Sequence, residues 1–311
     1  MMNFSIFLFF VFAVAAVNAR ATFEKKSPTK ASISAEEMFR LYEKAKKEVD
    51  ELNKKYPGAT FEINKFSFMS ETEKKKYYTT FPTLPKISNF VTFDDENITA
   101  PESYDYRDYG KVSPVKNQTS HCGSCYAFAA TAAVESQYLI HTDLVLDLSE
   151  EYLLECDAAD GECEGGTIDH ALNVYHTKGV PSEECVPYTG KNGTCPDDLN
   201  CIKYAIGGYK YLGDDESKYP GLLFKYGPIG IGLIVGDYLA HYHDGVLDIP
   251  LEDCGKDGHA VLLVGYTKDY WIAKNSWGTD RGEEGYFRFK RGVNFCNFNT
   301  LLTPVVPFFD N

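Results

Sequence analysis

Apolar positions follow three different patterns along this chain of 311 residues, and each pattern predicts a different kind of element. The first is a continuous apolar run over residues 4–17, which ends in the small-x-small sequence Val17-Asn18-Ala19. Such a run with a small-residue cleavage pattern is typical of a secretory signal peptide, and we expect one over residues 1–19. A signal anchor is the alternative, but the run is short for one, and no later stretch is long and apolar enough to cross a membrane.

The second pattern is a helical period that precedes residue 57. Ser34 and Glu37 form a capping-box sequence, and Pro57-Gly58 ends the helix that this box begins. Apolar residues recur three or four positions apart between these two signals, at Met38, Leu41, Tyr42, Ala45, Val49, Leu52 and Tyr56. The opposite face is rich in Lys and Glu. Because an amphipathic helix of this kind is unstable alone, we expect it to cover another surface.

The third pattern separates helices from strands after residue 100. Residues 125–139 are apolar on every side, which predicts a buried central helix. Further helices are expected over residues 149–156, with Ser149 as N-cap, and over residues 167–177. Short apolar β-type runs follow at residues 229–235, 260–266, 270–274 and 286–290. The predicted class is therefore α+β, with a cleft between a helical first half and a β-rich second half.

Charge is divided unevenly along the chain. Residues 20–99 carry 15 Lys and Arg against 13 Asp and Glu, whereas residues 100–311 carry 16 against 32. These counts give net charges of +2 and −16, which together make the −14 of the whole chain. An acidic part repels nucleic acid and anionic membranes, so neither is expected as a partner.

One cysteine stands in a context suited to catalysis. Cys125 opens the predicted central helix, where the positive end of the helix dipole favours a thiolate over a thiol. His259 follows it by 134 residues and Asn275 by 150. A thiolate nucleophile, its base and an amide that orients the base would come in this order. The alternative is an inert buried cysteine, which the helix-start position and the distant His and Asn disfavour.

Three short motifs resemble those of the papain-like cysteine proteases, the cathepsin-type enzymes. The motifs are Cys122-Gly-Ser-Cys125-Tyr126, Gly258-His259-Ala260 and Asn275-Ser276-Trp277-Gly278, and the similarity runs from residue 100 almost to the C-terminus. The resemblance implies a papain-like two-subdomain fold over residues 100–311, with no cofactor and no metal. It also implies that Cys125 is the nucleophile and His259 its base, and that Asn275 orients the imidazole behind the shield of Trp277.

Two positions depart from the pattern of the family. Gln118 is expected to stabilise the oxyanion together with the backbone N–H of Cys125, yet seven positions separate the two residues, one more than in most members. Arg281 stands where a second tryptophan is common, which would leave the hydrogen bond of Asn275 more open to water. His121 lies inside the first of these intervals, and we assign it no catalytic role.

The resemblance also implies a substrate-binding surface around the nucleophile. Its expected residues are Gly123, Gly165, Gly166, Thr167, Ile168, Gly232, Ala260, Trp277 and Leu301. Glycine is needed where a substrate backbone approaches closely, as at Gly166. Leu301 would close the pocket that sets specificity, so we expect Leu, Val or an aromatic side chain of the substrate there in preference to Arg. Asp257 is the one carboxylate that would change this preference, if it reached the rim of the pocket.

Nine cysteines indicate an oxidising environment, and an odd number leaves one thiol free. The resemblance implies three disulfides, Cys122–Cys163, Cys156–Cys195 and Cys254–Cys296. Cys185 and Cys201 then remain at the two ends of one loop, and we expect them to pair. A zinc site near Cys156 and Cys163 is the alternative, disfavoured because no second Cys-x-x-Cys or His pair stands near them.

Residues 20–99 are expected to be an inhibitory propeptide. Tyr42, Val49 and Asn53 match part of a helical motif found in the prosegments of the family, and residues 61–66 resemble the strand that follows it. A helical accessory that stays permanently attached is the alternative. Residues 79–100 are rich in Pro, Thr, Asn and Asp and lack a helical period, so we expect this stretch to be exposed and cleavable.

These features together predict a cysteine endopeptidase that acts on proteins and peptides and is activated by removal of its own propeptide. A catalytically weak homologue that acts as a binding protein is the alternative, left open by Gln118 and Arg281. An exopeptidase or transpeptidase is disfavoured because no cleft-blocking insertion stands between Cys195 and His259.

The ends and sequons of the chain predict its route. We expect a monomer that enters the secretory pathway and works in a lysosome-like acidic compartment or outside the cell. Asn97 and Asn192 are predicted glycosylation sites. Asn117 heads a third sequon, which we expect to be unused because a glycan there would crowd the active site.

Overall fold

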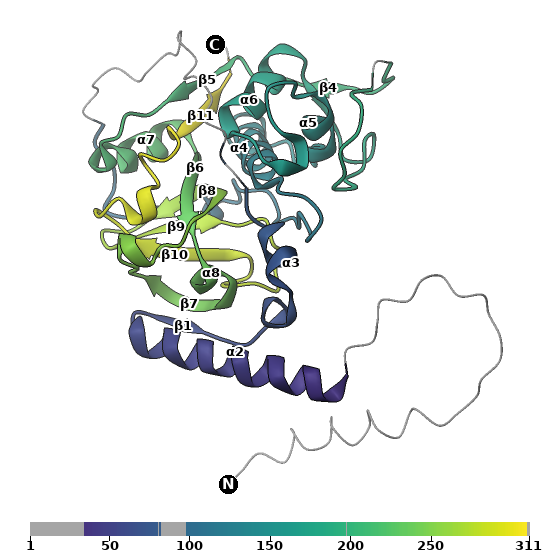
Figure 1. Ribbon diagram of the computed structural model, residues 1–311. Coiled ribbons are helices and arrows are strands. Elements are labelled where there is room, and N and C mark those ends of the chain that lie inside the picture. Colours follow the sequence, from purple (N-terminus) through teal and green to yellow (C-terminus); the bar gives the residue numbers. More distant parts are fainter. Residues whose placement is uncertain (1–33, 80, 82–97, 197, 310–311) are drawn as a thin grey trace, which may run out of the picture. The chain divides into compact units, whose positions relative to one another are not determined.

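Helices and strands occupy separate stretches of the chain in the computed structural model, which describes residues 34–79, 81, 98–196 and 198–309 (Figure 1). Contacts divide the chain into two units, Met1–Phe39 and Arg40–Asn311. The predicted signal peptide and most of the expected cleavable stretch, with Asn97, lie outside the described residues. Among the helices that the structure describes, none has the length and apolar character needed to cross a membrane.

The segment before residue 80 contributes a long helix and a short strand. Its elements are helix α2 (Ala35–Lys55), strand β1 (Ala59–Phe61), the 3-10 helix η1 (Lys65–Phe68) and helix α3 (Glu71–Lys75). Ser34 caps α2 as predicted, because its hydroxyl accepts a hydrogen bond from the backbone N–H of Glu37 at 3.1 Å. Val49 lies buried on the apolar face of the helix. The Asn53 side chain joins α2 to β1 through two hydrogen bonds of 2.9 Å with the backbone of Phe61.

Helix α4 (Cys125–Thr142) is the central helix of the fold. Its first ten residues are all buried, as the apolar pattern predicted. The helix continues three residues past the predicted end, to the point where Asp143 adopts a left-handed backbone with φ of 57°. Helices α5 (Glu150–Cys156) and α6 (Ile168–Thr177) pack against it, and Ser149 caps α5 by accepting from the N–H of Tyr152 at 3.0 Å.

A large, mostly antiparallel sheet forms the second half of the fold. Its strands after β1 are β2 (Tyr104–Asp105), β5 (Gly208–Tyr211), β6 (Ile229–Val235), β7 (Tyr242–Leu247), β8 (Asp257–Tyr266), β9 (Tyr270–Lys274), β10 (Tyr286–Lys290) and β11 (Val305–Phe308). They follow the order β1-β7-β10-β9-β8-β6-β11-β5, with β2 paired to β8. Strands β3 (Val180–Pro181) and β4 (Lys203–Tyr204) form a separate pair.

Short helices complete the chain. These are α7 (Tyr219–Tyr226), α8 (Asp237–His241) and the 3-10 helices η2 (Tyr106–Tyr109), η3 (Glu162–Glu164), η4 (Glu216–Lys218), η5 (Leu251–Asp253) and η6 (Phe295–Asn297). In Figure 1 helices α4, α5 and α6 gather on one side of the catalytic part, with the β3–β4 pair beside them, and the strands of the large sheet lie on the other side, with α4 against β8. The predicted α+β class, helical first and β-rich second, is confirmed.

Two predicted elements have different bounds in the structure. Strand β8 begins at Asp257, so His259 lies within the strand and not before it. The expected strand over residues 61–66 is wrong, because β1 ends at Phe61. The Asn64 side chain accepts a hydrogen bond from the N–H of Phe66 at 2.9 Å and turns the chain into η1.

Four disulfides join the described cysteines in the pairs expected from the sequence. They are Cys122–Cys163, Cys156–Cys195, Cys185–Cys201 and Cys254–Cys296. Cys125 is the free cysteine, and it is buried. The odd thiol of the sequence is therefore the one at the start of α4.

Candidate active site

Helix α4 and strand β8 bring the thiol and the histidine segment together. Cys125 is fully buried, and its Sγ accepts a hydrogen bond from the backbone N–H of Ala260 at 3.3 Å. His259 directly precedes Ala260 in β8 and is fully buried as well. The start of a buried helix and the central strand thus place two residues that are distant in the sequence at one point.

An amide orients the imidazole of His259. Its Nε2 lies 2.8 Å from Oδ1 of Asn275, so the ring N–H donates to the amide oxygen. The Trp277 ring packs against the imidazole, with 4.8 Å between ring centroids, and is almost completely buried. The other ring nitrogen, Nδ1, has no hydrogen-bond partner among the described residues. This leaves Nδ1 available for proton transfer.

Burial keeps both reactive groups neutral in this state. Desolvation raises the pKa of the Cys125 thiol to about 12, although the hydrogen bond from Ala260 acts in the opposite direction. Desolvation also lowers the pKa of His259 to about 4, although the hydrogen bond to Asn275 raises it. At neutral pH the two groups are therefore an uncharged thiol and an uncharged imidazole.

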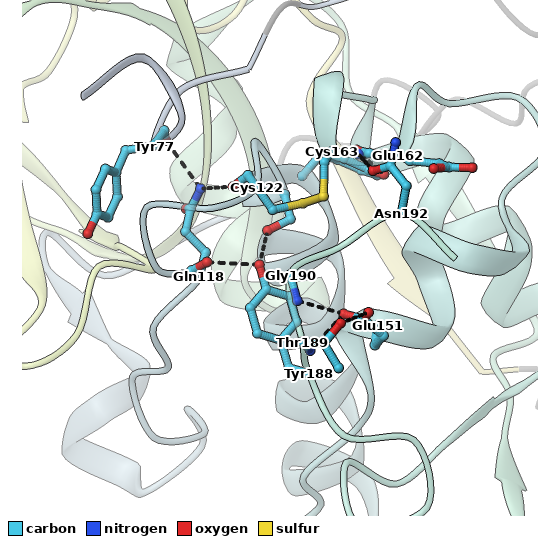
Figure 2. Close-up of a disulfide and its surroundings, with 12 residues drawn as sticks. Tyr77, Gln118, Cys122, Glu151, Glu162, Cys163, Tyr188, Thr189, Gly190 and Asn192 are labelled. Carbon is cyan, nitrogen blue, oxygen red and sulfur yellow. Dashed lines mark hydrogen bonds between the residues drawn. A yellow bond between two sulfur atoms is a disulfide. The ribbon is translucent and has the colours of Figure 1, made fainter. Parts of the chain in front are cut away.

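Gln118 contacts Cys122, at the start of the motif that ends in Cys125, despite the extra residue between Gln118 and Cys125. Its buried Nε2 donates to the backbone oxygens of Tyr77 and Cys122 at 3.2 and 3.3 Å (Figure 2). Its Oε1 accepts from the Ser276 hydroxyl at 2.6 Å, which fixes the orientation of the amide. Thr119 has a φ of 61°, so a left-handed turn directly after Gln118 takes up the extra length.

Two consecutive residues of the segment before residue 80 lie against the strand and the ring of His259. Thr79 and Gly258 exchange two backbone hydrogen bonds, of 2.8 and 3.1 Å, which lay the prosegment against β8. The Tyr78 ring stands edge-on to His259, with 6.4 Å between centroids. The backbone oxygen of Tyr78 lies so near Gly123 that an added Cβ would come within 2.7 Å of it. Gly123 therefore permits a close approach of another backbone.

Aromatic rings of the prosegment continue over Trp277. Phe66 is fully buried, and its ring centroid lies 5.2 Å from that of Trp277 and 4.5 Å from that of Tyr77. Arg281 was expected to leave the hydrogen bond between Asn275 and His259 more open to water. Instead its guanidinium stacks on Phe66 at 5.1 Å, and with the prosegment in place Asn275 is only 8% exposed.

Strand β6 and helix α6 bring several of the expected specificity-pocket residues close together. Gly232 pairs with Ala260 in the register of β6 and β8, and Ile168 packs beside Gly230. An added Cβ on Gly232 would come within 2.9 Å of the Phe81 ring, so this prosegment side chain fills the space that the glycine leaves. The expected pocket residues Ile168, Gly232 and Ala260 thus lie together, with an aromatic ring between them and solvent.

Leu302, the residue after the expected Leu301, lies beside Gly232. An added Cβ on Gly232 would come within 2.6 Å of the Leu302 side chain. Cys296 and Asn297 both have left-handed backbones, with φ of 46° and 62°. Counting forward from Cys296 assumes a regular spacing that these turns remove.

The loop with Gly165 and Gly166 follows the Cys122–Cys163 disulfide (Figure 2). Gly165 has a φ of 126°, which side chains rarely allow. An added Cβ on Gly166 would collide with the Asp160 side chain, whose carboxylate accepts from the N–H of Thr167 at 3.1 Å. Both glycines are therefore required by the shape of the loop itself.

Asp257 lies away from the pocket at Gly232. It pairs with Val235 in the sheet and lines a separate hollow with Glu48 and Tyr56 of the prosegment. The pocket wall formed by Leu302 thus stays apolar at this end.

Tyr188 and Ser276 both hydrogen-bond to Gln118, but only Ser276 lies in a motif that the sequence made recognisable. The Tyr188 hydroxyl donates to the backbone oxygen of Gln118 at 2.8 Å and lies 2.7 Å from Oγ of Ser124 (Figure 2). Tyr188 lies in a loop with no motif, so its sequence context carried no signal. Ser276, which holds the Gln118 amide, directly follows Asn275 in a motif that was recognised.

Comparisons with known proteins agree with this geometry. Residues 100–305 match the family model described as papain family cysteine protease. The viral cathepsin of Lymantria dispar multicapsid nuclear polyhedrosis virus is 36% identical over 263 residues, which cover 80% of this chain and 72% of that protein. Fruit bromelain of Ananas comosus is also 36% identical, over 82% of this chain and 75% of its own length.

Solved precursor structures are similar over most of the chain. The digestive procathepsin L2 proteinase from Tenebrio molitor larval midgut has a TM-score of 0.81 and 31% identity, and the match covers 98% of this chain and 99% of that one. A recombinant stem bromelain precursor has a TM-score of 0.76 and 34% identity, with 88% and 91% covered. The similarity therefore includes the segment before residue 100.

Proposed function

Because this chain belongs to the papain family of cysteine proteases and is a cysteine endopeptidase made as a zymogen, we propose that Cys125 is its nucleophile and His259 its general base and acid. One contact carries this assignment above the others. The Gln118 amide donates to the backbone oxygen of Tyr77 at 3.2 Å and to that of Cys122, three residues before the thiol, at 3.3 Å. A carbonyl oxygen of the prosegment therefore occupies the donor that a substrate oxyanion requires.

The catalytic cycle follows from these positions. The thiol proton of Cys125 passes to Nδ1 of His259, and the thiolate sulfur bonds to the carbonyl carbon of the scissile peptide. The carbonyl π electrons move to oxygen, where Nε2 of Gln118 and the N–H of Cys125 stabilise the charge. The C–N bond then breaks, and His259 gives its proton to the leaving amine. Water, deprotonated by His259, attacks the thioester and releases the acid and the thiol.

The prosegment holds this chemistry latent by burying it. Tyr77, Tyr78 and Thr79 cover Cys125 and His259, and burial is the largest cause of both pKa shifts. Removing the cover admits water, which lowers the pKa of the thiol and raises that of the imidazole. Both changes favour the thiolate–imidazolium pair that the reaction needs.

Acid is proposed to release the prosegment through His241 of helix α8. This side chain is buried under the prosegment, with Nδ1 3.2 Å from the backbone oxygen of Glu62 and 3.4 Å from Oγ of Ser67. Burial lowers the pKa of docked His241, although the hydrogen bond to Glu62 raises it. Docking is therefore stable above the ordinary histidine pKa of about 6.5 and weakens as pH falls below it, because the released state binds the proton.

Charged groups from three elements face His241. Glu48 of α2 lies 3.9 Å from Nε2, and both Glu48 and Asp237 of α8 raise the pKa. Lys74 of α3 lowers it. Burial is the largest of these causes, so the shift of the pKa is downward.

The specificity pocket is proposed to prefer an apolar or aromatic substrate residue over arginine. Phe81 fills the space beside Gly232 and Gly258 in the precursor, and Leu302 forms the wall opposite. An apolar wall leaves a guanidinium without a partner for its lost hydration. The substrates are proteins and peptides that present such a side chain at this pocket.

The disulfides and the proenzyme relatives suggest the secretory pathway, and we propose an acidic, lysosome-like compartment or the cell exterior as the destination. The cleavage that frees the enzyme is placed near residue 100, where the family match begins. A glycan is proposed on Asn192, which is exposed and uses only Oδ1 to bind the N–H of Cys163, so that Nδ2 stays available. The enzyme is proposed to act as a monomer.

Titration with an epoxide inhibitor of thiols tests the assignment. The acid-processed enzyme should cleave dipeptidyl fluorogenic substrates and lose all activity once one inhibitor has modified each chain, at Cys125. A matched sample of Cys125→Ala should take up none and cleave nothing. A catalytically weak binding protein would instead react with the inhibitor while showing no peptidase activity at any pH.

A further inference from the structure

A cluster of metal-ligating side chains lies outside the catalytic pair. Among the residues that the structure describes, Asp157, Asp160 and His170 form one group whose ligand atoms all lie within 4.8 Å of one another. Asp157 directly follows helix α5, Asp160 lies in the next loop, and His170 lies in the first turn of α6. The residue before Asp157 is Cys156, which a disulfide fixes to Cys195.

Two atoms in this cluster lack the partners that buried polar atoms need. Asp157 is only 8% exposed, and one of its oxygens accepts from the N–H of Ala159 at 3.1 Å. Its Oδ2 is buried without a hydrogen-bond partner among the described residues, and so is Nδ1 of His170. That Nδ1 lies 3.4 Å from Oδ1 of Asp160, an ion-pair distance when the imidazole is protonated, so a metal ion bound between the two would take the place of the imidazole proton. A buried carboxylate oxygen without a partner is costly unless a cation neutralises it.

We propose that Asp157, Asp160 and His170 bind one zinc-like divalent transition-metal ion. One imidazole and two carboxylates are a donor set that zinc accepts, with water in the fourth position. Calcium and magnesium prefer all-oxygen sites, which this histidine argues against. Cys156 and Cys163 contribute no ligand to this site, because both are in disulfides.

The site lies directly under the loop proposed to hold the substrate backbone. Side-chain atoms of Asp160 lie within 2.4 to 2.7 Å of the position that a Cβ on Gly166 would take, and both carboxylate oxygens lie 3.1 Å from the N–H of Thr167. A metal ion bound to the Asp160 carboxylate would therefore influence the position of this loop backbone, because the same carboxylate accepts the hydrogen bond from Thr167. Only this consequence rests on the proposed function, since metal binding itself needs no catalysis.

Zinc titration of the full-length Cys125→Ala precursor tests the proposal. The alanine removes the free thiol, which is itself a zinc ligand, and also prevents self-processing. Chelator-treated protein at neutral pH should bind one zinc ion per chain in calorimetry. Cobalt(II) in its place should give the visible absorption of a low-symmetry site with nitrogen and oxygen ligands.

Variants of the ligands should weaken binding without unfolding the chain. His170→Gln and Asp157→Asn, each in the Cys125→Ala background, should lower the zinc affinity by at least about tenfold. His176→Gln is the matched control, because His176 lies on the same helix but outside the cluster, and it should bind zinc like the parent. Circular dichroism and the melting temperature show that each variant is folded.

Unchanged affinity in both ligand variants would overturn the proposal, as would a parent chain that binds no zinc. Equal losses in His170→Gln and His176→Gln would also overturn it, because binding would then follow the loss of any histidine of this helix. Peptidase assays are not part of the readout. A failed catalytic assignment and a failed metal site are therefore distinguishable.

Discussion

The prosegment meets the catalytic part at two places that differ in their chemistry. At the edge of the sheet, strand β1 pairs with β7, and charged groups surround the contact: Lys55 lies 2.7 Å from Asp253, and Glu48 lies 3.9 Å from His241. In the cleft, the contacts are buried rings and backbone hydrogen bonds. Exposed ion pairs are screened by salt and altered by pH, whereas buried apolar contacts respond weakly to both.

This difference separates two tasks. The rings of Phe66 and Tyr78 exclude water from the cleft and so set the protonation of the catalytic groups. The sheet edge carries the titratable groups and can report the pH of the medium. Under the proposed function, one segment both silences the enzyme and senses the pH at which it is released.

Removal of the nucleophile gives the largest effect and separates chemistry from docking. Cys125→Ala and His259→Ala should each abolish cleavage of fluorogenic peptides, and the double variant should be no worse, because groups that act as one unit are not additive. Asn275→Ala should keep measurable activity, since it orients the base without reacting. The kcat/KM values of acid-processed protein decide this, and full activity in Cys125→Ala would refute the assignment.

Loss of a buried ring should open the cleft at neutral pH. Phe66→Ala removes a fully buried side chain that contacts Tyr77 and Trp277, a change that typically costs about 3–5 kcal/mol. The rate at which a thiol reagent labels Cys125 in the intact precursor should rise more than about a hundredfold. Phe39→Ala, at an exposed ring of helix α2, is the control and should leave the rate unchanged. Equal rates in both variants would mean that the cleft is not held by ring packing.

Charge placed in the apolar pocket should change specificity. Leu302→Glu should raise kcat/KM for Arg-Arg relative to Leu-Arg substrates by about tenfold or more, because a carboxylate would then face Gly232. Leu301→Glu serves as the matched control and should change the ratio much less. A larger change of this ratio in Leu301→Glu than in Leu302→Glu would show that Leu301, and not Leu302, forms the pocket wall.

A proton sensor at the sheet edge should be removable without damage to the cleft. Burial lowers the pKa of docked His241, so docking is lost as pH falls through the pKa of the released state. His241→Phe cannot take up this proton, so the increase in Cys125 labelling on acidification should be clearly smaller than in the parent. His243→Phe alters an exposed neighbour on β7 and should keep the response. If His241→Phe shows the same increase in Cys125 labelling on acidification as the parent, the pH dependence must arise from the carboxylates instead of His241.

The smallest expected effect tests the exposed ion pair of the sheet edge. Lys55→Gln removes the partner of Asp253 and should raise Cys125 labelling only slightly at low salt. At high salt the variant and the parent should become equal, whereas the effect of Phe66→Ala should persist. A salt-independent effect of Lys55→Gln would contradict the division between a charged edge and an apolar cleft.

Local patterns made much of the fold predictable. The apolar run after Cys125 defined the central helix because burial on every side leaves a signature in consecutive residues. The motifs likewise indicated that His259 and Asn275 lie together, and in the structure His259 lies in strand β8 and Asn275 directly after strand β9. The helix from Ser34 was visible through its cap and its period.

Contacts between distant segments were not predictable in the same way. Phe66 stacking on Trp277, and Glu62 over His241, depend on how the prosegment folds across the sheet, and no local period encodes that path. The contact of Leu302 with Gly232 has a similar origin, because the left-handed turn at Asn297 breaks any count along the chain. Backbone geometry, and not residue type, decided these positions.

Removal of the prosegment takes strand β1 from the edge of the sheet, and this should change how readily the enzyme associates with itself. Strand β1 is the last strand of the sheet beside β7, so its departure uncovers the backbone donors and acceptors of β7 that it had satisfied. A newly bared edge invites pairing with any extended chain, including a second copy of the enzyme. Activated protein should therefore self-associate more readily than its precursor as concentration rises, and the −16 charge of residues 100–311 becomes the repulsion that opposes it.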